Sequence, residues 1–286
     1  MKKSLKKSNL TGWLLMVLLV MGSCNNEDSP VLEEDTSIEV AQLVASDEAD
    51  LISEEIANIG EDVYATEEIR ATSKSFFLSN YLPDCVTITT VVTNDNKETT
   101  IDFGEGCELP NGNLLSGIIH LSYAKDMEMA SKTIDLSLEN FTFNEVAVEG
   151  GATLERKRSN ENGNPQSNAV ASYTGLWPDG SEASFTGNRT REWVEGYGSG
   201  FWADNVFLIS GKGTYTNKAG DVYSRETISS LRRELSCRFI VSGVLEISKN
   251  ETTVSLDFGD GTCDAKGMLT YPNGETEEIL LRRFNR

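Results

Sequence analysis

The sequence offers few residue combinations that could carry out a reaction. Its single histidine, His120, lies in the β-branched run Gly117-Ile118-Ile119-His120-Leu121. A Ser-His-Asp hydrolase would have to use this histidine, but the chain has no nucleophile elbow of the form G-x-S-x-G to meet it. We therefore expect His120 to face the surface or a neighbouring hairpin strand, and we assign no catalytic residue.

Paired carboxylates are the next candidates for chemistry. Asp102 and Glu105, and again Asp257 and Asp260, stand three residues apart around a glycine. Their oxygens could hold calcium, but the dense alternating ligands of an EF-hand loop are missing. We prefer a turn role, in which Asp-Phe-Gly-x-Gly ends a strand and reverses the chain, and we predict no metal and no other cofactor. A polysaccharide hydrolase that uses two carboxylates stays an alternative.

Residues 185–202 form the most distinctive stretch for binding. In a strand, alternate side chains share a face, so two arginines and a tryptophan would point the same way before a glycine-rich loop with further aromatics. Such a set could stack on sugars or hold an anionic group, or the arginines could pair with nearby acids inside the core. The candidate ligand-binding residues are Arg189, Arg191, Trp193, Tyr197 and Trp202.

The first 23 residues have the organisation of a secretory signal peptide. Lysines at positions 2, 3, 6 and 7 precede an apolar run of residues 13–21, which is too short to cross a bilayer as a helix. The segment Leu18-Leu19-Val20-Met21-Gly22-Ser23-Cys24 resembles a bacterial lipobox. We therefore predict cleavage before Cys24 and an anchor of acyl chains on that cysteine, which is the protein's contact with the membrane.

The four remaining cysteines are expected to form disulfides in an oxidising compartment. The midpoint of Cys85 and Cys107 falls in a turn at 94–97, and that of Cys237 and Cys263 falls in a turn at 248–251. Each pair would then face across its own hairpin. The alternative, in which the two hairpins are joined to each other, requires them to lie side by side in one sheet.

Charge is strongly negative and uneven along the chain. Residues 1–23 hold four lysines and no acid, so the mature chain has 21 basic and 45 acidic side chains, a net charge of −24. Residues 24–70 account for −14 of this, with 15 acids and one arginine. Such a surface repels phosphate groups, so nucleic acid is not an expected partner.

The chain divides into an acidic start, one helix and a β domain. Ile52, Ile56, Ile59 and Val63 recur at steps of four, three and four, which is one face of an amphipathic helix packed on the domain. From position 84 onward, short Val-, Ile- and Thr-rich runs alternate with turn residues and indicate antiparallel hairpins. We predict a signal peptide at 1–23, an acidic flexible tether at 24–46, a helical lead-in at 47–83 and a mainly β meander at 84–286, either a sandwich or a curved half-barrel.

A hairpin repeat frames the β domain and gives the chain a family resemblance. The segment Ile101-Asp102-Phe103-Gly104-Glu105-Gly106-Cys107 recurs as Leu256-Asp257-Phe258-Gly259-Asp260-Gly261-Thr262-Cys263, and each copy follows a strand that opens with a cysteine. With Arg189-Thr190-Arg191-Glu192-Trp193, these segments resemble a family of Bacteroidetes envelope lipoproteins over residues 50–281. The resemblance implies an envelope location and a β-rich fold, and it implies no reaction.

These observations favour a non-enzymatic lipoprotein of the outer membrane, exposed on the cell surface, with a binding or structural role. A glycan or a protein would be its ligand. Two alternatives stay open beside the hydrolase: a periplasmic location, and a carrier of lipid or lipoprotein whose helix and curved sheet enclose an apolar groove.

Overall fold

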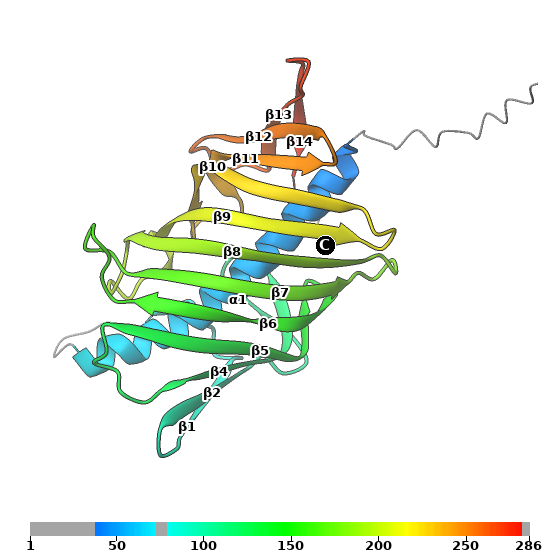
Figure 1. The fold of residues 1–286 in the computed structure, drawn as a ribbon. Coiled ribbons are helices and arrows are strands. Elements are labelled where there is room, and N and C mark those ends of the chain that lie inside the picture. Colours follow the sequence, from blue (N-terminus) through cyan, green and yellow to red (C-terminus); the bar gives the residue numbers. More distant parts are fainter. Residues whose placement is uncertain (1–37, 73–78, 282–286) are drawn as a thin grey trace, which may run out of the picture. The chain divides into compact units, whose positions relative to one another are not determined.

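One antiparallel sheet makes up most of the protein. The computed structural model describes residues 38–72 and 79–281, so the predicted signal peptide, Cys24 and the tether up to residue 37 lie outside it. In these residues fourteen strands follow one another as a meander, and only the short β3 lies off this path, paired with β4 (Figure 1). The sheet is open, with β1 at one edge and β14 at the other. The predicted mainly β meander is confirmed, and one continuous sheet replaces the sandwich alternative.

The elements have the following bounds. Helix α1 covers Val40–Thr72, and the short 3-10 helix η1 covers Trp202–Asp204. The strands are β1 (Thr87–Val92), β2 (Asn96–Asp102), β3 (Cys107–Glu108), β4 (Leu114–Ala124), β5 (Ser131–Phe143), β6 (Val146–Lys157), β7 (Gln166–Leu176), β8 (Glu182–Glu195), β9 (Val206–Asn217), β10 (Val222–Glu234), β11 (Ile240–Lys249), β12 (Thr252–Asp260), β13 (Lys266–Thr270) and β14 (Thr276–Leu280).

Several hairpins are closed by the same turn. The N–H of Trp177 donates to the carbonyl oxygen of Ser181, and the N–H of Gly180 donates back to that of Trp177. The turns at Gly220 and Gly274 repeat both bonds. Each of these glycines has a positive φ, between 81° and 90°, which disfavours other residues. These glycines are among the turn residues that separate the apolar runs in the sequence, so the turns lie where the sequence indicates hairpins.

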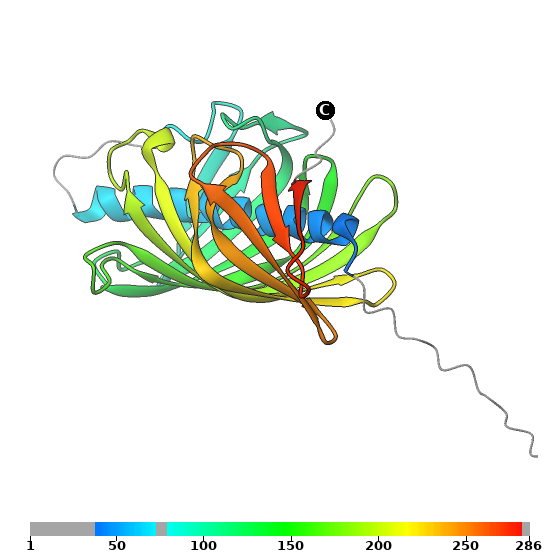
Figure 2. The ribbon, with the colours of Figure 1, turned by 90° about the horizontal axis from the view of Figure 1, so that it is seen from above.

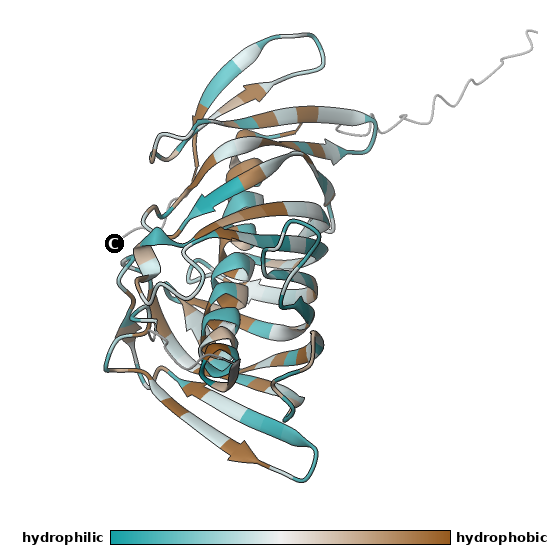
Figure 3. Ribbon diagram, turned by 90° about the vertical axis from the view of Figure 1, so that its left-hand side faces the viewer, coloured by the Kyte–Doolittle hydropathy of each residue, from teal (hydrophilic) through white to brown (hydrophobic). Residues whose placement is uncertain are grey.

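Helix α1 is longer and more deeply buried than the sequence suggested. It begins at Val40, so residues 40–46 belong to the helix and not to the predicted tether. Only the apolar stripe was expected to be covered, but Glu54, Glu61 and Asp62 are also at most 6% exposed. The reason is visible in Figures 2 and 3, where the sheet curves around α1 and holds it in its hollow.

Small residues let the helix lie close to the sheet. Ala171, Gly187 and Gly213 are neighbours in register across β7, β8 and β9. On the helix, a Cβ at Gly60 would lie 3.0 Å from a methyl carbon of Leu136 on β5. A glycine inside a helix costs roughly 1 kcal/mol relative to alanine, and here close packing accounts for it.

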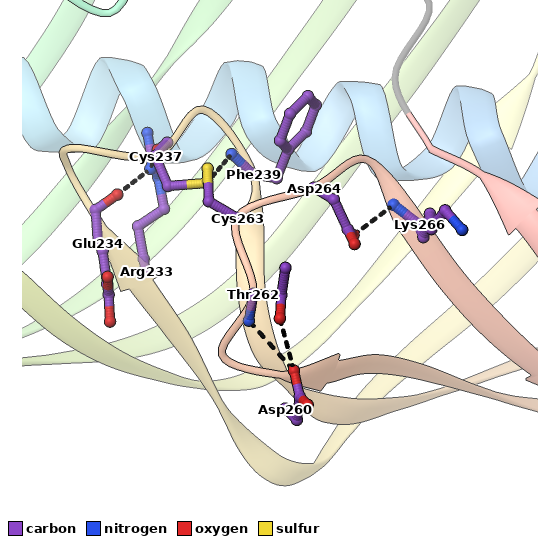
Figure 4. The surroundings of a disulfide bond; sticks show 9 residues. All are labelled: Arg233, Glu234, Cys237, Phe239, Asp260, Thr262, Cys263, Asp264 and Lys266. Atoms are coloured by element: carbon purple, nitrogen blue, oxygen red, sulfur yellow. Dashed lines mark hydrogen bonds between the residues drawn. A yellow bond between two sulfur atoms is a disulfide. The ribbon is translucent and has the colours of Figure 1, made fainter.

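Both disulfides join cysteines within one hairpin region, as predicted. Cys85 is bonded to Cys107. Cys237 is bonded to Cys263, and Figure 4 shows this second bridge. The alternative that joins the two repeats is therefore wrong. Each bridge closes a loop of more than 20 residues, so each contributes about 3 kcal/mol of stability in the chain-entropy model.

The repeated carboxylates stabilise the turns beside these bridges. Asp102 accepts a bond from the backbone N–H of Gly104 at 2.8 Å, and Asp257 does the same in the second copy. Asp260 accepts from both the N–H and the hydroxyl of Thr262 (Figure 4). Within residues 38–72 and 79–281, no group of three or more His, Cys, Asp or Glu residues is arranged to hold a metal ion.

The loops that carry the disulfides also reach α1. The Glu55 carboxylate accepts bonds from the Tyr81 hydroxyl, the Asn111 amide at 3.0 Å and the Asn113 amide at 3.3 Å. Arg233 of β10 adds a cation 3.8 Å from the same carboxylate. Loop residues and one strand residue thus converge on a single carboxylate of the helix. In the described residues, no helix is apolar enough over a sufficient length to span a membrane.

Candidate functional site

The predicted binding arginines point into the protein and pair with α1. Arg189 of β8 contacts the carboxylates of Asp50 and Glu54, the latter at 2.8 Å. Arg191 lies 3.0 Å from Glu54 and also pairs with Glu61, with its guanidinium 4.3 Å from the centre of the Phe207 ring. The pairing of these arginines with nearby acids, which the sequence left open, is thus what the structure shows.

The same pattern continues along the helix. Arg156 of β6 lies 3.3 Å from Glu68, and Arg225 of β10 pairs with Asp50. Burial alone would raise the pKa of Glu54, but Arg191 and Arg189 outweigh it and hold this pKa below its ordinary value. The described hollow therefore contains buried ion pairs between an acidic helix and a basic inner face of the sheet. Two cavities between α1 and the sheet have volumes of about 30 and 20 Å³, whereas a lipid carrier would need a far larger apolar groove.

Two further carboxyls of α1 have raised pKa values. Burial raises the pKa of Glu61 although Arg191 and Arg156 oppose it. Burial also raises the pKa of Asp62 to about 6, against a hydrogen bond from Ser79. A raised pKa suits a general acid. Both side chains are buried, however, and a substrate in solution would not reach them. We therefore infer that Glu61 and Asp62 have a structural role.

The predicted aromatics pack beside these ion pairs. Trp193 is 5% exposed and forms an edge-to-face contact with Tyr197, whose hydroxyl donates to Glu68 at 2.9 Å. Trp202 is half-buried against Tyr81. The predicted residues Arg189, Arg191, Trp193, Tyr197 and Trp202 thus come together near α1, but most of their surface is turned inward. His120 lies on the outer side of β4 and contacts Glu139 at 2.9 Å.

A groove that is open to solvent lies at the start of α1. It has a volume of about 710 Å³ and is bounded by the first turns of the helix, the β7–β8 turn, the β9–β10 turn and strand β14. This volume lies in the range of small-molecule sites in proteins. Its walls combine apolar side chains with amides and carboxylates, and they come from four segments far apart in the sequence.

Trp177 contributes its indole ring to this groove. Contacts with neighbouring residues fix both its backbone and its ring. It opens the Trp177-Pro178-Asp179-Gly180-Ser181 turn and makes both of the turn's cross-bonds. A Cβ at Gly175 would come within 2.9 Å of the ring, so the missing side chain there is what lets the indole lie against the strand. The half-buried indole is thus presented to the groove in a fixed position.

Polar groups complete the groove. The Asn217 amide donates to Gln42 of α1 at 3.2 Å and so ties the β9–β10 turn to the helix. Tyr215 is 5% exposed, and its burial raises the pKa of the hydroxyl to about 12, with smaller contributions from Tyr223 and Glu48. This set of one aromatic platform, amides and hydroxyls can hold a polar ring compound.

The sequence did not point to this groove. Trp177 was not among the residues that the sequence analysis selected. An aromatic residue immediately before Pro-Asp-Gly, and again before Pro-Asn-Gly at Tyr271, is the feature that could have indicated it. Comparisons with protein-family models, with curated proteins and with solved structures find no match to this chain.

Proposed function

We propose that the protein is a lipid-anchored envelope lipoprotein that binds a saccharide, without transforming it, in the groove at the start of α1. The observation that supports this most is Trp177, a half-buried indole held against Gly175 on the wall of a 710 Å³ groove. An immobilised aromatic ring loses little entropy when a sugar ring stacks on it. Amide and hydroxyl groups nearby supply hydrogen bonds to sugar hydroxyls.

The anchor at Cys24 and the exposure on the cell surface are part of the same proposal. They rest on the signal peptide and the lipobox, which precede the described residues. The acidic segment after Cys24 would keep the domain away from the membrane by self-repulsion. The helix that follows is buried in the sheet, so the domain would be presented as one rigid body with its groove open to solvent.

The two alternatives have less support. A lipid carrier would need α1 to leave the hollow and to expose its carboxylates and the arginines of the sheet. A hydrolase would need an acid with a raised pKa in the groove, whereas Glu61 and Asp62 lie enclosed along α1.

The binding proposal can be measured with the mature protein in mild detergent. A panel of neutral and charged hexasaccharides would be titrated by calorimetry against the protein and the variant Trp177→Ala. We expect at least one saccharide to bind and the variant to lose about tenfold or more in affinity, as is common for a central aromatic contact. Val170→Ala is the control, since Val170 is 66% exposed and does not line the groove.

Two results would overturn the proposal. If no saccharide binds, or if Trp177→Ala binds as well as the control, the groove is not a saccharide site. If chromatography of the incubated saccharides reveals shorter products, the protein is a hydrolase and the non-enzymatic role is wrong.

A further inference from the structure

The groove has a strongly one-sided charge. Its walls include the carboxylates of Glu48, Asp179, Glu182, Glu277 and Glu278, whereas Lys218 is the one basic side chain among the described residues that line it. The Lys218 ammonium donates to the backbone carbonyl oxygen of Gly180 at 3.1 Å and forms no ion pair with these acids. The described residues that line the groove therefore give it a negative charge.

Some of these carboxylates are compensated and others are not. Glu278 pairs with Lys266 at 3.0 Å. Glu277 accepts a bond from the Tyr271 hydroxyl at 2.7 Å, which leaves its charge in place. In the described part of the chain, neither Glu182 nor Glu277 has a cationic side chain within 4.0 Å. Among the described residues, two negative charges thus face the groove without a cationic partner.

The aromatic side chains of the groove also favour a positively charged ligand. The face of an indole or phenol ring attracts a cation through its quadrupole, and tryptophan does so most strongly. Trp177 and Tyr215 both line the groove. A ligand with an apolar ring face and a positive charge would satisfy the aromatics and the free carboxylates together, while an anionic ligand would be repelled.

We propose that the groove selects a sugar that carries a protonated amino group, of which glucosamine is the simplest example. This inference rests on the proposed saccharide binding and names the class of saccharide. The ring stacks on Trp177, and the ammonium group lies near Glu182 and Glu277. Neutral sugars make only the first of these interactions.

Three hexasaccharides of equal length would test this at pH 6, where the amine is protonated. They contain glucosamine, N-acetylglucosamine or galacturonic acid units, and they are titrated against the mature protein in detergent. We expect the glucosamine hexamer to bind about tenfold more tightly than the acetylated one, because ion contacts with the two exposed carboxylates together supply this much. The galacturonic acid hexamer should not bind, and 0.5 M salt should reduce the preference.

A variant that lacks the two groove carboxylates distinguishes their effect from that of the negative net charge of the whole chain. The double variant Glu182→Gln/Glu277→Gln should lose the tenfold preference but keep its affinity for the acetylated hexamer. Both residues are exposed, so the fold should tolerate the change. The matched control is Glu149→Gln/Glu155→Gln, which removes the same charge from exposed positions on β6 and should keep the preference.

The outcomes are distinct. If both hexamers bind equally and Trp177→Ala weakens both, saccharide binding stands and the amino-sugar inference is wrong. If no hexamer binds, both proposals fail. If the β6 control loses the preference as the groove variant does, the amine is attracted by overall charge and the inference is also wrong.

Discussion

Replacing Arg191 with methionine should destabilise the protein severely. The Arg191 side chain is 1% exposed and lies between Glu54 and Glu61, which are 7% and 2% exposed. Methionine keeps the aliphatic packing against Phe207 but leaves two buried carboxylates without their shared cation. Removing one partner of a buried ion pair costs about 3–5 kcal/mol, most of it the penalty of the unpaired charge. We expect a loss of that size in the free energy of unfolding at pH 7.

The loss should depend on pH in a defined direction. Without Arg191, Glu54 still has Arg189 at 2.8 Å, but burial raises the folded-state pKa of Glu61 further above that of the unfolded chain. A carboxyl with a raised folded pKa binds its proton more tightly in the native state, so the variant should recover stability relative to the wild type as the pH falls from 7 towards 5. Adding Glu61→Gln should recover about 2 kcal/mol at pH 7, because it removes the buried charge that has lost its ion-pair partner, whereas Glu54 keeps its contact with Arg189.

Urea unfolding followed by circular dichroism measures these differences from the midpoint and slope of each transition. The control is Arg232→Met. Arg232 is 32% exposed and pairs with Glu195 and Glu234, so its loss should cost less than about 1 kcal/mol. A cost for Arg191→Met as small as that of the control, or one that does not vary with pH, would refute the view that buried charges lock α1 into the sheet.

Three further predictions concern single residues. Asp62→Asn should stabilise the protein at pH 7 by roughly 3 kcal/mol, because the wild-type carboxyl, with its pKa of about 6, must ionise in a buried site. The wild type should lose this stability as the pH rises from about 4 to about 6. A difference in unfolding free energy between variant and wild type that does not change with pH would contradict this prediction. Cys85→Ala/Cys107→Ala should lower the free energy of unfolding by about 3 kcal/mol in urea titrations, whereas no change would mean that the bridge does not constrain the unfolded chain. Cys24→Ala should abolish the incorporation of labelled palmitate in the source bacterium and release the protein from membranes, and labelling that persists would remove the anchor from the account.

The fold could be predicted largely because its signals are local. Turn glycines, such as Gly180 and Gly274, need a particular φ, and alternating apolar residues mark the strands between them. The disulfides followed from the midpoint of each hairpin, since the residues that face each other across an antiparallel pair are symmetric about the turn. Both inferences need only the residues of one hairpin.

The burial of α1 could not be predicted in the same way. Glu61 and its partner Arg191 are 130 residues apart in the sequence, and a helical glutamate without a visible partner is normally a solvated one. A hint exists in the strands, because Arg189 and Arg191 have the same parity as the inward-facing Phe185 and Trp193. Charged residues at core positions on several strands indicate that an acidic element lies inside.

The groove was missed for a related reason. Its walls come from the start of α1, two turns and the last strand, which are adjacent only because the sheet curves. The β7–β8 turn contributes Trp177 and Glu182, but Tyr215 and Glu277 come from distant segments. The arginines and aromatics of β8 are closer together in the sequence and therefore attracted the binding prediction, although they serve to hold α1.

Hydrogen–deuterium exchange with and without the tightest-binding hexasaccharide tests the central claim, that the groove at the start of α1 is the binding site. The account predicts that the saccharide slows exchange in the β7–β8 turn, in the β9–β10 turn and in the first turns of α1, while exchange in the β11–β12 turn is unchanged. Protection confined to other parts of the chain, or no protection at saturating saccharide, would contradict it.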